Sequence, residues 1–144
     1  MEAVALLCDF AEEVNGKLYI MGGAWSEVRG PAPINCAIGV RLATPWNKTN
    51  EKHDLAVRLI TEDGAVAEDL NDNRIEATGE FEVGRPPGSL PGNEIVSAFA
   101  FQFQGLVVDT GAYRFGFFVD DTELASARFR VLRPPGWKVE IADD

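Results

Sequence analysis

The sequence of 144 residues is poor in the side chains that most often carry catalysis. It has one histidine, His53, and two cysteines, Cys8 and Cys36. No Cys-x-x-Cys pair exists, neither cysteine has a histidine nearby in the sequence, and the Gly-x-Ser-x-Gly motif of serine hydrolases is missing. We therefore predict no catalytic residue, no metal and no cofactor. His53 is expected to be a solvated residue of a polar loop, and the cysteines to be buried thiols, or a disulfide if their strands are neighbours.

Long apolar runs and an excess of basic residues are missing as well. No segment approaches the ~20 apolar residues that cross a bilayer, and the N-terminus lacks the basic start and apolar stretch of a signal peptide. The 23 acidic residues outnumber the 13 basic ones, for a net charge of −10. This charge repels the phosphates of nucleic acids over most of the surface. We expect a cytoplasmic protein that binds neither nucleic acid nor membrane.

A sustained 3.6-residue apolar period is also missing, and short alternating runs are present in its place. Residues 34–42 alternate between apolar and polar side chains, and Asn15-Gly16 is a strong hairpin signal. Gly111 and Tyr113 are typical of a corner where a tyrosine hydroxyl bonds to the upstream backbone. The pattern predicts an all-β fold, an antiparallel immunoglobulin-like β-sandwich of about eight or nine strands.

The clearest element is a hairpin between residues 106 and 132, with aromatic residues on one face of its first strand. We predict a three-residue loop, 120–122, that places Val119 opposite Glu123 and keeps Arg128 outside. The pairs predicted by this register are Tyr113 with Phe129, Phe115 with Ala127 and Phe117 with Ala125.

Residues 1–132 are predicted to form a single sandwich domain, followed by a spacer and an extended arm at 133–144. Arg133-Pro-Pro-Gly136 is stiff and cannot continue a strand ladder. Beyond it, Trp137, Val139 and Ile141 alternate with polar residues, as in one more strand with an apolar face. We predict that this arm packs as an extended segment that covers Trp137, either on its own domain or on the sheet edge of a neighbour.

Further candidate contact residues lie in loops and on two charged faces. Trp46 stands beside a proline, and Arg85 lies in the rigid loop 84–92. Glu76, Glu80 and Glu82 form an acidic strand face, and Arg114, Arg128 and Arg130 form a basic one. If these strands belong to different sheets, the two patches meet only between molecules. Pairing across one sheet, or two solvated faces, is the alternative.

One acidic loop partly matches a calcium-binding pattern. Asp69, Asn71 and Asn73 stand at positions 1, 3 and 5, with Glu80 at position 12. Arg74 replaces the glycine that the sharp turn needs, so a solvated acidic loop is the favoured interpretation.

Three short motifs resemble an uncharacterised bacterial family. They are Ala5-Leu-Leu-Cys-Asp-Phe-Ala11, Gly16-Lys17-Leu-Tyr-Ile-Met-Gly-Gly23 and Gly84-Arg-Pro-Pro-Gly88. Members are similar small proteins that begin with an Ala-Asp-Tyr-Ala-like motif, and Cys8-Asp9-Phe10-Ala11 stands in that place. The resemblance implies a bacterial source and no known activity, so it assigns no functional residue.

These observations favour a non-enzymatic interaction or assembly module. We expect it to act through sheet edges, exposed aromatic loops and the C-terminal arm, toward a protein partner or in self-association. The alternative is an enzyme, or a small-ligand or calcium-binding protein, whose acidic groups gather only in the fold.

Overall fold

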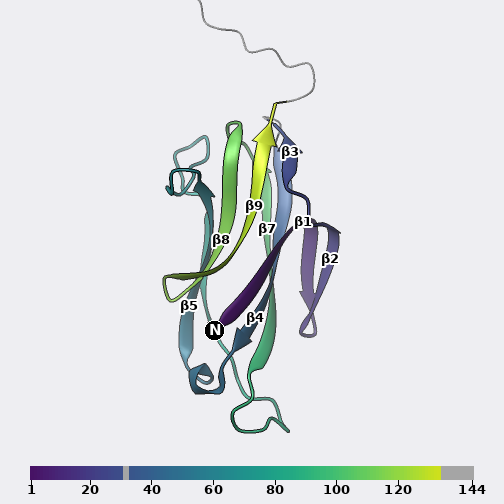
Figure 1. Ribbon diagram of the computed structural model, residues 1–144, viewed down its shortest axis with the longest axis vertical. Helices are drawn as coiled ribbons and strands as arrows, with labels where there is room; N and C mark the ends of the chain where they lie inside the picture. Colours follow the sequence, from purple (N-terminus) through teal and green to yellow (C-terminus); the bar gives the residue numbers. More distant parts are fainter. Residues whose placement is uncertain (31–32, 134–144) are drawn as a thin grey trace, which may run out of the picture.

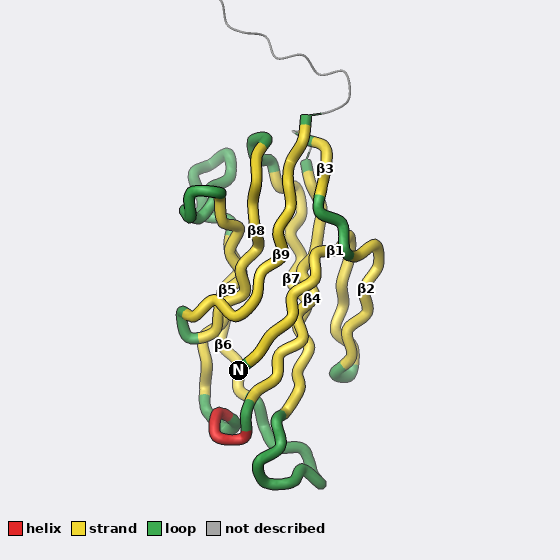
Figure 2. Tube along the Cα trace, viewed as in Figure 1, coloured by secondary structure: helices red, strands yellow, loops and turns green. Residues whose placement is uncertain are grey.

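The structure is a computed structural model that describes residues 1–30 and 33–133. Its nine described strands form two packed sheets, which confirms the predicted all-β sandwich (Figures 1 and 2). Sheet A has the order β2-β1-β4-β7 and sheet B the order β3-β9-β8-β5-β6. The more specific expectation of an immunoglobulin-like topology stays a prediction. The elements are β1 Glu2–Val14, β2 Lys17–Gly23, β3 Glu27–Arg29, β4 Ile34–Thr44, the 3-10 turn η1 Trp46–Lys48, β5 Lys52–Thr61, β6 Glu76–Glu82, β7 Ile95–Leu106, β8 Gly111–Val119 and β9 Thr122–Leu132.

The core lies between the two sheets and is formed by the alternating apolar residues of the central strands. Ile38 and Val40 of β4 face Val57 of β5 and Phe115 and Phe117 of β8, and all five are essentially inaccessible to solvent. Burying each such side chain stabilises the fold by roughly 1.5–3 kcal/mol. The sandwich therefore rests on its own apolar core, and the two cysteines are free.

The β8–β9 hairpin has the predicted register but a different loop. Asp120 and Asp121 form a two-residue turn with φ of 48° and 65°, and Val119 pairs with Thr122 instead of Glu123. The register then shifts at a bulge in which Leu124 is the extra residue. Because the bulge compensates for the shorter loop, the three predicted pairs are confirmed: Tyr113 with Phe129, Phe115 with Ala127, and Phe117 with Ala125.

The tyrosine corner is confirmed as well. The Tyr113 hydroxyl donates a hydrogen bond of 2.8 Å to the carbonyl of Asp109. This bond ties the chain entering β8 to the preceding loop, as sequence spacing predicted.

The two cysteines lie on neighbouring strands but do not form a disulfide. Cys8 of β1 pairs with Ala37 and belongs to a small cluster on the outer side of sheet A, whereas Cys36 of β4 belongs to the main core. Burial, followed by the influence of Cys8 and Asp9, raises the pKa of Cys36 to about 12. Such a thiol stays protonated and behaves as a small apolar side chain.

Candidate functional site

The β1–β2 hairpin leaves its sheet and forms a layer of its own. β1 pairs with β4 only as far as Cys8, and from there to Val14 it pairs with β2. The segment Asp9–Gly23, which we call the arm, lies on the side of sheet A that faces away from sheet B (Figure 1). The sandwich thus carries a partial third layer at this place.

Small residues on the outer face of sheet A let the arm lie close to it. Leu18 and Ile20 pack over Gly39 of β4, where an added Cβ would be 3.0 Å from Leu18 Cδ2 and 3.3 Å from Ile20 Cδ1. Ala11 is buried against Ala37, and the side-chain amide of Gln102 donates a hydrogen bond to the Ala11 carbonyl. Because larger residues here would lift the arm, its position is built into the sequence of β4.

The residues at the turn of the arm suit the backbone conformation of a tight hairpin. Asn15 and Gly16 have φ of 51° and 78°, the backbone that an Asn-Gly hairpin turn requires. The Gly16 amide donates a hydrogen bond of 2.7 Å to the Glu13 carboxylate. Gly22 has φ of 63°, and the Asp9 carboxylate fills the space where its Cβ would stand. A residue larger than glycine at position 22 would adopt a strained φ and would displace the Asp9 carboxylate.

The outward side of the arm carries three large exposed apolar residues, with the exposed Glu12 beside them as the ladder partner of Tyr19. Phe10 pairs with Met21, and Tyr19 lies two residues before Met21 on the same face; their exposed fractions are 44%, 67% and 53%. We call these three residues the apolar face of the arm. Among residues 1–30 and 33–133, β2 pairs only with β1, so its other edge presents unpaired backbone groups. Leu18 to Ser26 contains no charged residue.

The hairpin predicted at Asn15-Gly16 is confirmed. Sequence reasoning missed that the hairpin lies over sheet A with one face exposed, although one signal for this was present. Leu18-Tyr-Ile-Met21 is apolar at every position, a pattern that is usual for a strand covered on both faces. Among the residues that the structure describes, only one face of β2 is covered, and Tyr19 and Met21 on the other face are exposed. An apolar strand next to an Asn-Gly turn is therefore a signal for either a buried strand or an exposed binding edge.

His53, at the start of β5, is buried, and the prediction of a solvated loop residue is wrong. Only 3% of it is exposed. Its Nδ1 lies 2.7 Å from Asp120 Oδ2 and its Nε2 lies 2.8 Å from the Lys48 carbonyl. Asp120 also accepts a hydrogen bond from the Asp54 amide at 2.9 Å. The His53–Asp120 pair joins the start of β5 to the β8–β9 turn.

The protonation of His53 follows from these partners. A carbonyl and a carboxylate only accept, so both ring nitrogens donate when the imidazolium is formed. Burial lowers the pKa of His53, but the bonds to Lys48 and Asp120 and the nearby negative charges outweigh burial and raise it. The pKa of Asp120 is lowered, chiefly by the bond from His53. A ring with both nitrogens engaged is a structural clasp and has no free lone pair for general-base catalysis.

Two predicted contact residues, Trp46 and Arg85, contact each other. The Arg85 guanidinium lies 3.8 Å from the Trp46 ring centre. Its Nε donates to Thr49 Oγ1 at 2.7 Å and its Nη2 to the Trp46 carbonyl at 3.0 Å. These bonds fasten the proline-rich loop to η1, and Trp46 is left half-buried.

The two charged faces lie in the same sheet, so the condition under which the patches would point in opposite directions is not met. β6 with its glutamates and the β8–β9 hairpin with its arginines both belong to sheet B. Glu76 binds Arg58 of β5 at 3.0 Å, whereas Glu80 and Glu82 pair along the ladder with Asp54 and Lys52. No contact is seen between the two predicted patches among the described residues.

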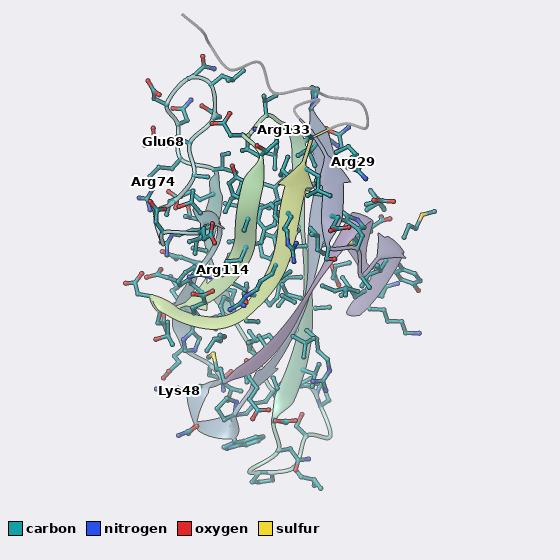
Figure 3. All side chains as sticks on the ribbon, turned by 45° about the horizontal axis from the view of Figure 1, so that its top comes forward. Arg29, Lys48, Glu68, Arg74, Arg114 and Arg133 are labelled. Carbon is teal, nitrogen blue, oxygen red and sulfur yellow. The ribbon has the colours of Figure 1, made fainter. Side chains whose placement is uncertain are left out.

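Arg114 and Arg128 do face each other across the β8–β9 ladder, as predicted. The Glu123 carboxylate accepts two hydrogen bonds of 2.9 and 3.0 Å from Arg114, which reduces the repulsion between the two arginines. Figure 3 labels Arg114 on the β8–β9 hairpin. Arg130 pairs with Ala112 and is exposed. The arginines are thus spread along the outer face of sheet B.

The acidic loop of the calcium-like pattern is organised by its own backbone. Asp69 accepts hydrogen bonds from the amides of Asn71 and Asn73, at 2.8 and 3.0 Å, and these bonds lower its pKa. Glu80 belongs to β6. Within the described part of the chain, no group of three or more histidine, cysteine or acidic side chains is arranged to hold a metal ion.

An open depression of about 380 Å³ on the outer face of sheet B is lined in part by Asp54, Arg58, Glu80 and Phe118. Arg58 lies 4.8 Å from the Phe118 ring centre and donates to Glu76, so its charge is already engaged. The remaining predicted contact residues, Trp137, Val139 and Ile141, lie outside the described residues.

None of the helical residues that the structure describes forms a segment long and apolar enough to cross a bilayer. Searches among curated proteins and among solved structures gave no match. A family model described as a family of unknown function (DUF6941) matches residues 3–132, from the start of β1 to the last residue of β9. The predicted resemblance to an uncharacterised family is thereby confirmed, and the chain belongs to the family of unknown function DUF6941.

Proposed function

We propose that the protein is a non-enzymatic interaction module and that the arm is its docking element. An extended segment of a partner protein adds to the unpaired edge of β2, and its side chains contact the apolar face formed by Phe10, Tyr19 and Met21. The observation that carries this proposal is the combination of an open strand edge with exposed aromatic and methionine side chains on the same strand. Exposed edges of this kind favour strand addition.

The charges around the arm define the chemistry of the partner. Asp9, Glu12 and Glu13 are exposed on the arm, against a single basic residue, Lys17. A complementary segment has apolar residues at alternate positions, with lysine or arginine beside them. A second copy of this chain brings the same acidic arm and a further net charge of −10. Electrostatics therefore favour a different, basic partner over self-association.

A non-enzymatic role is supported by the state of the titratable groups. His53 has both ring nitrogens engaged, and Asp120, its partner, is held by the Asp54 amide. Acid–base catalysis needs a group that can reach a substrate proton, and the arm offers apolar and backbone groups instead.

A cross-linking experiment tests the proposal. A photo-reactive residue is placed at Met21 or, as a control, at Leu90, an exposed leucine in the loop at the far end of the sandwich. The protein captured in cells of the source organism is then identified, purified and titrated against the wild type and the variants Y19K/M21K and L90K. We expect at least about tenfold weaker binding for Y19K/M21K and no change for L90K, because apolar contacts of this size dominate interfaces.

Three outcomes contradict the proposal. The captured protein binds Y19K/M21K and the wild type equally, capture occurs only from Leu90, or the species captured at Met21 is a second copy of this chain. Equal melting temperatures of the variants confirm that the substitutions act on the surface alone.

A further inference from the structure

The outer face of sheet B is locally basic, although the chain as a whole is acidic. β3, β8 and β9 together carry four arginines and two glutamates, whereas the net charge of the chain is −10. Arg128 and Arg130 stand on either side of the buried Phe129, so they point away from the core. Both are exposed, and Arg114 of β8 faces Arg128 across the ladder. We call Arg114, Arg128 and Arg130 the arginine cluster.

The arginine cluster is unfavourable for the isolated fold. Like charges directly opposite each other on neighbouring strands destabilise a sheet, and Glu123 binds only one of the two facing arginines, Arg114. Within residues 1–30 and 33–133, no carboxylate forms an ion pair with Arg128 or Arg130. Departures from such local rules are expected at functional sites. The cluster is therefore better suited to an anionic ligand than to the stability of the sheet.

Two adjoining open depressions give a ligand room to lie between these arginines. One measures about 290 Å³ and includes Glu62 in its lining, and the other measures about 300 Å³ and includes Glu27. Ala112 and Arg128 line both depressions. Because Ala112, the ladder partner of Arg130, has only a methyl side chain, an extended chain can approach the backbone of the sheet at this place.

The spacing of the charges indicates the class of ligand. Arg128 and Arg130 are two residues apart on one strand, which places them roughly 6–7 Å from each other. Acidic residues at alternate positions of an extended peptide repeat at the same interval, so each of two carboxylates can meet one arginine. Glu27 and Glu62 line the depressions and repel a chain that is charged at every unit, such as a nucleic acid. The arrangement favours a peptide with spaced carboxylates.

We propose that the arginine cluster is a second binding surface, which takes an extended acidic segment of a partner protein. Glutamate or aspartate at alternate positions of the segment pairs with Arg128 and Arg130, since a guanidinium group can bind a carboxylate through two parallel hydrogen bonds. The cluster lies on sheet B, whereas the arm lies over sheet A and carries acidic residues that favour a basic partner. The two surfaces therefore select partners of opposite charge, and binding at one does not require binding at the other.

Titration of the full-length chain with defined peptides tests the proposal. The probe is a short fluorescent peptide of alternating serine and glutamate, and its control has glutamine in place of every glutamate. The variant R128Q/R130Q removes two charges of the cluster, and the matched control R41Q/R74Q removes two exposed arginines elsewhere. We expect R128Q/R130Q to bind the glutamate peptide at least about tenfold more weakly than wild type, because charge-assisted hydrogen bonds are lost. R41Q/R74Q should bind it within about twofold of wild type, because distant surface charges are screened.

The fold of the variants is checked by thermal unfolding. Removing Arg128 relieves its repulsion by Arg114, so R128Q/R130Q should melt no lower than wild type. If it does melt lower, the single variant R130Q, at a position opposite Ala112, serves for the same comparison with R41Q.

Four results overturn the proposal. They are equal weakening by the cluster variant and its control, equal binding of the glutamine peptide, tighter binding of a single-stranded oligonucleotide of the same charge, and no binding by wild type at millimolar peptide. Because the probes carry no apolar residue, none of these results bears on the apolar face of the arm. A failure here is thus distinct from a failure of the proposed function.

Discussion

The two sheets expose edge strands of opposite character. β6, at one edge of sheet B, carries Glu80 and Glu82 on an exposed side. β2, at one edge of sheet A, carries Tyr19 and Met21 and no charge after Lys17. Charged side chains are a common device against the addition of foreign strands. Because the same chain uses this device at β6, its absence at β2 is a property of that strand and not of the fold.

The difference extends to what lies beneath each edge. The arm is supported from below by a floor of small residues, and Leu18 and Ile20 fill the space over Gly39. At β6, Gly79 has open space around it, with only Leu55 Cδ1 at 4.0 Å from an added Cβ. The position of β2 above sheet A is therefore fixed by the residues beneath it. In β6, by contrast, the space around Gly79 can accept a larger side chain.

The largest expected effect comes from Gly39, which lies under the arm, and Gly79 within β6 is its matched control. Gly39→Val should destabilise the protein by about 1–3 kcal/mol, because the new methyl groups collide with Leu18 and Ile20 and lift the arm. Gly79→Val should be neutral within about 1 kcal/mol, since valine suits an extended strand with free space. Chemical denaturation measures both free energies. Equal losses for the two variants would refute the account of how the arm is positioned.

An intermediate effect is expected at the His53–Asp120 clasp, which belongs to sheet B and leaves the arm untouched. The raised pKa of His53 gives stability that is complete below its unfolded pKa of about 6.5 and is lost as pH rises through the folded pKa. The lowered pKa of Asp120 gives stability that is present above about 3.9 and is lost as pH falls through the folded pKa. The clasp is therefore strongest between about pH 4 and 6.5.

Asp120→Asn should cost about 1 kcal/mol within that pH window, a value kept low because the Asp120 side chain is half exposed. The cost should shrink as pH rises past the folded pKa of His53. Thermal unfolding from pH 4 to 9 measures the difference between variant and wild type. A cost that does not change with pH would contradict the coupling between Asp120 and the protonation of His53.

Sequence reasoning predicted the features that follow from the alternation of apolar and polar residues. It failed where residues far apart in the sequence determine the local structure. The β8–β9 register follows from one continuous apolar face, so it survived an error in the loop, which the bulge at Leu124 offsets. His53 looked solvated because its neighbours in sequence are polar, but its partner Asp120 lies 67 residues away. The open edge of β2 depends on the bend of β1 over sheet A, which no local pattern records. Whether the two charged faces share a sheet could not be decided from the sequence, because neither strand by itself records the strand order.

The smallest effect on stability is expected when the acidic edge is made to resemble the apolar one. Glu80→Val and Glu82→Val together remove both exposed carboxylates from this part of β6, and the free energy of unfolding should change by less than about 0.5 kcal/mol, as is usual for surface positions. The association state should change much more, because the edge keeps its unpaired backbone groups but loses the charges that resist strand addition. Light scattering as a function of concentration should detect self-association that the wild type does not show. The converse variant, Tyr19→Glu with Met21→Glu, should stay as dispersed as the wild type while the partner no longer binds to β2. If the β6 variant remains fully monodisperse, edge charge is not what separates the two strands, and the exposed side chains of the arm must act without strand addition.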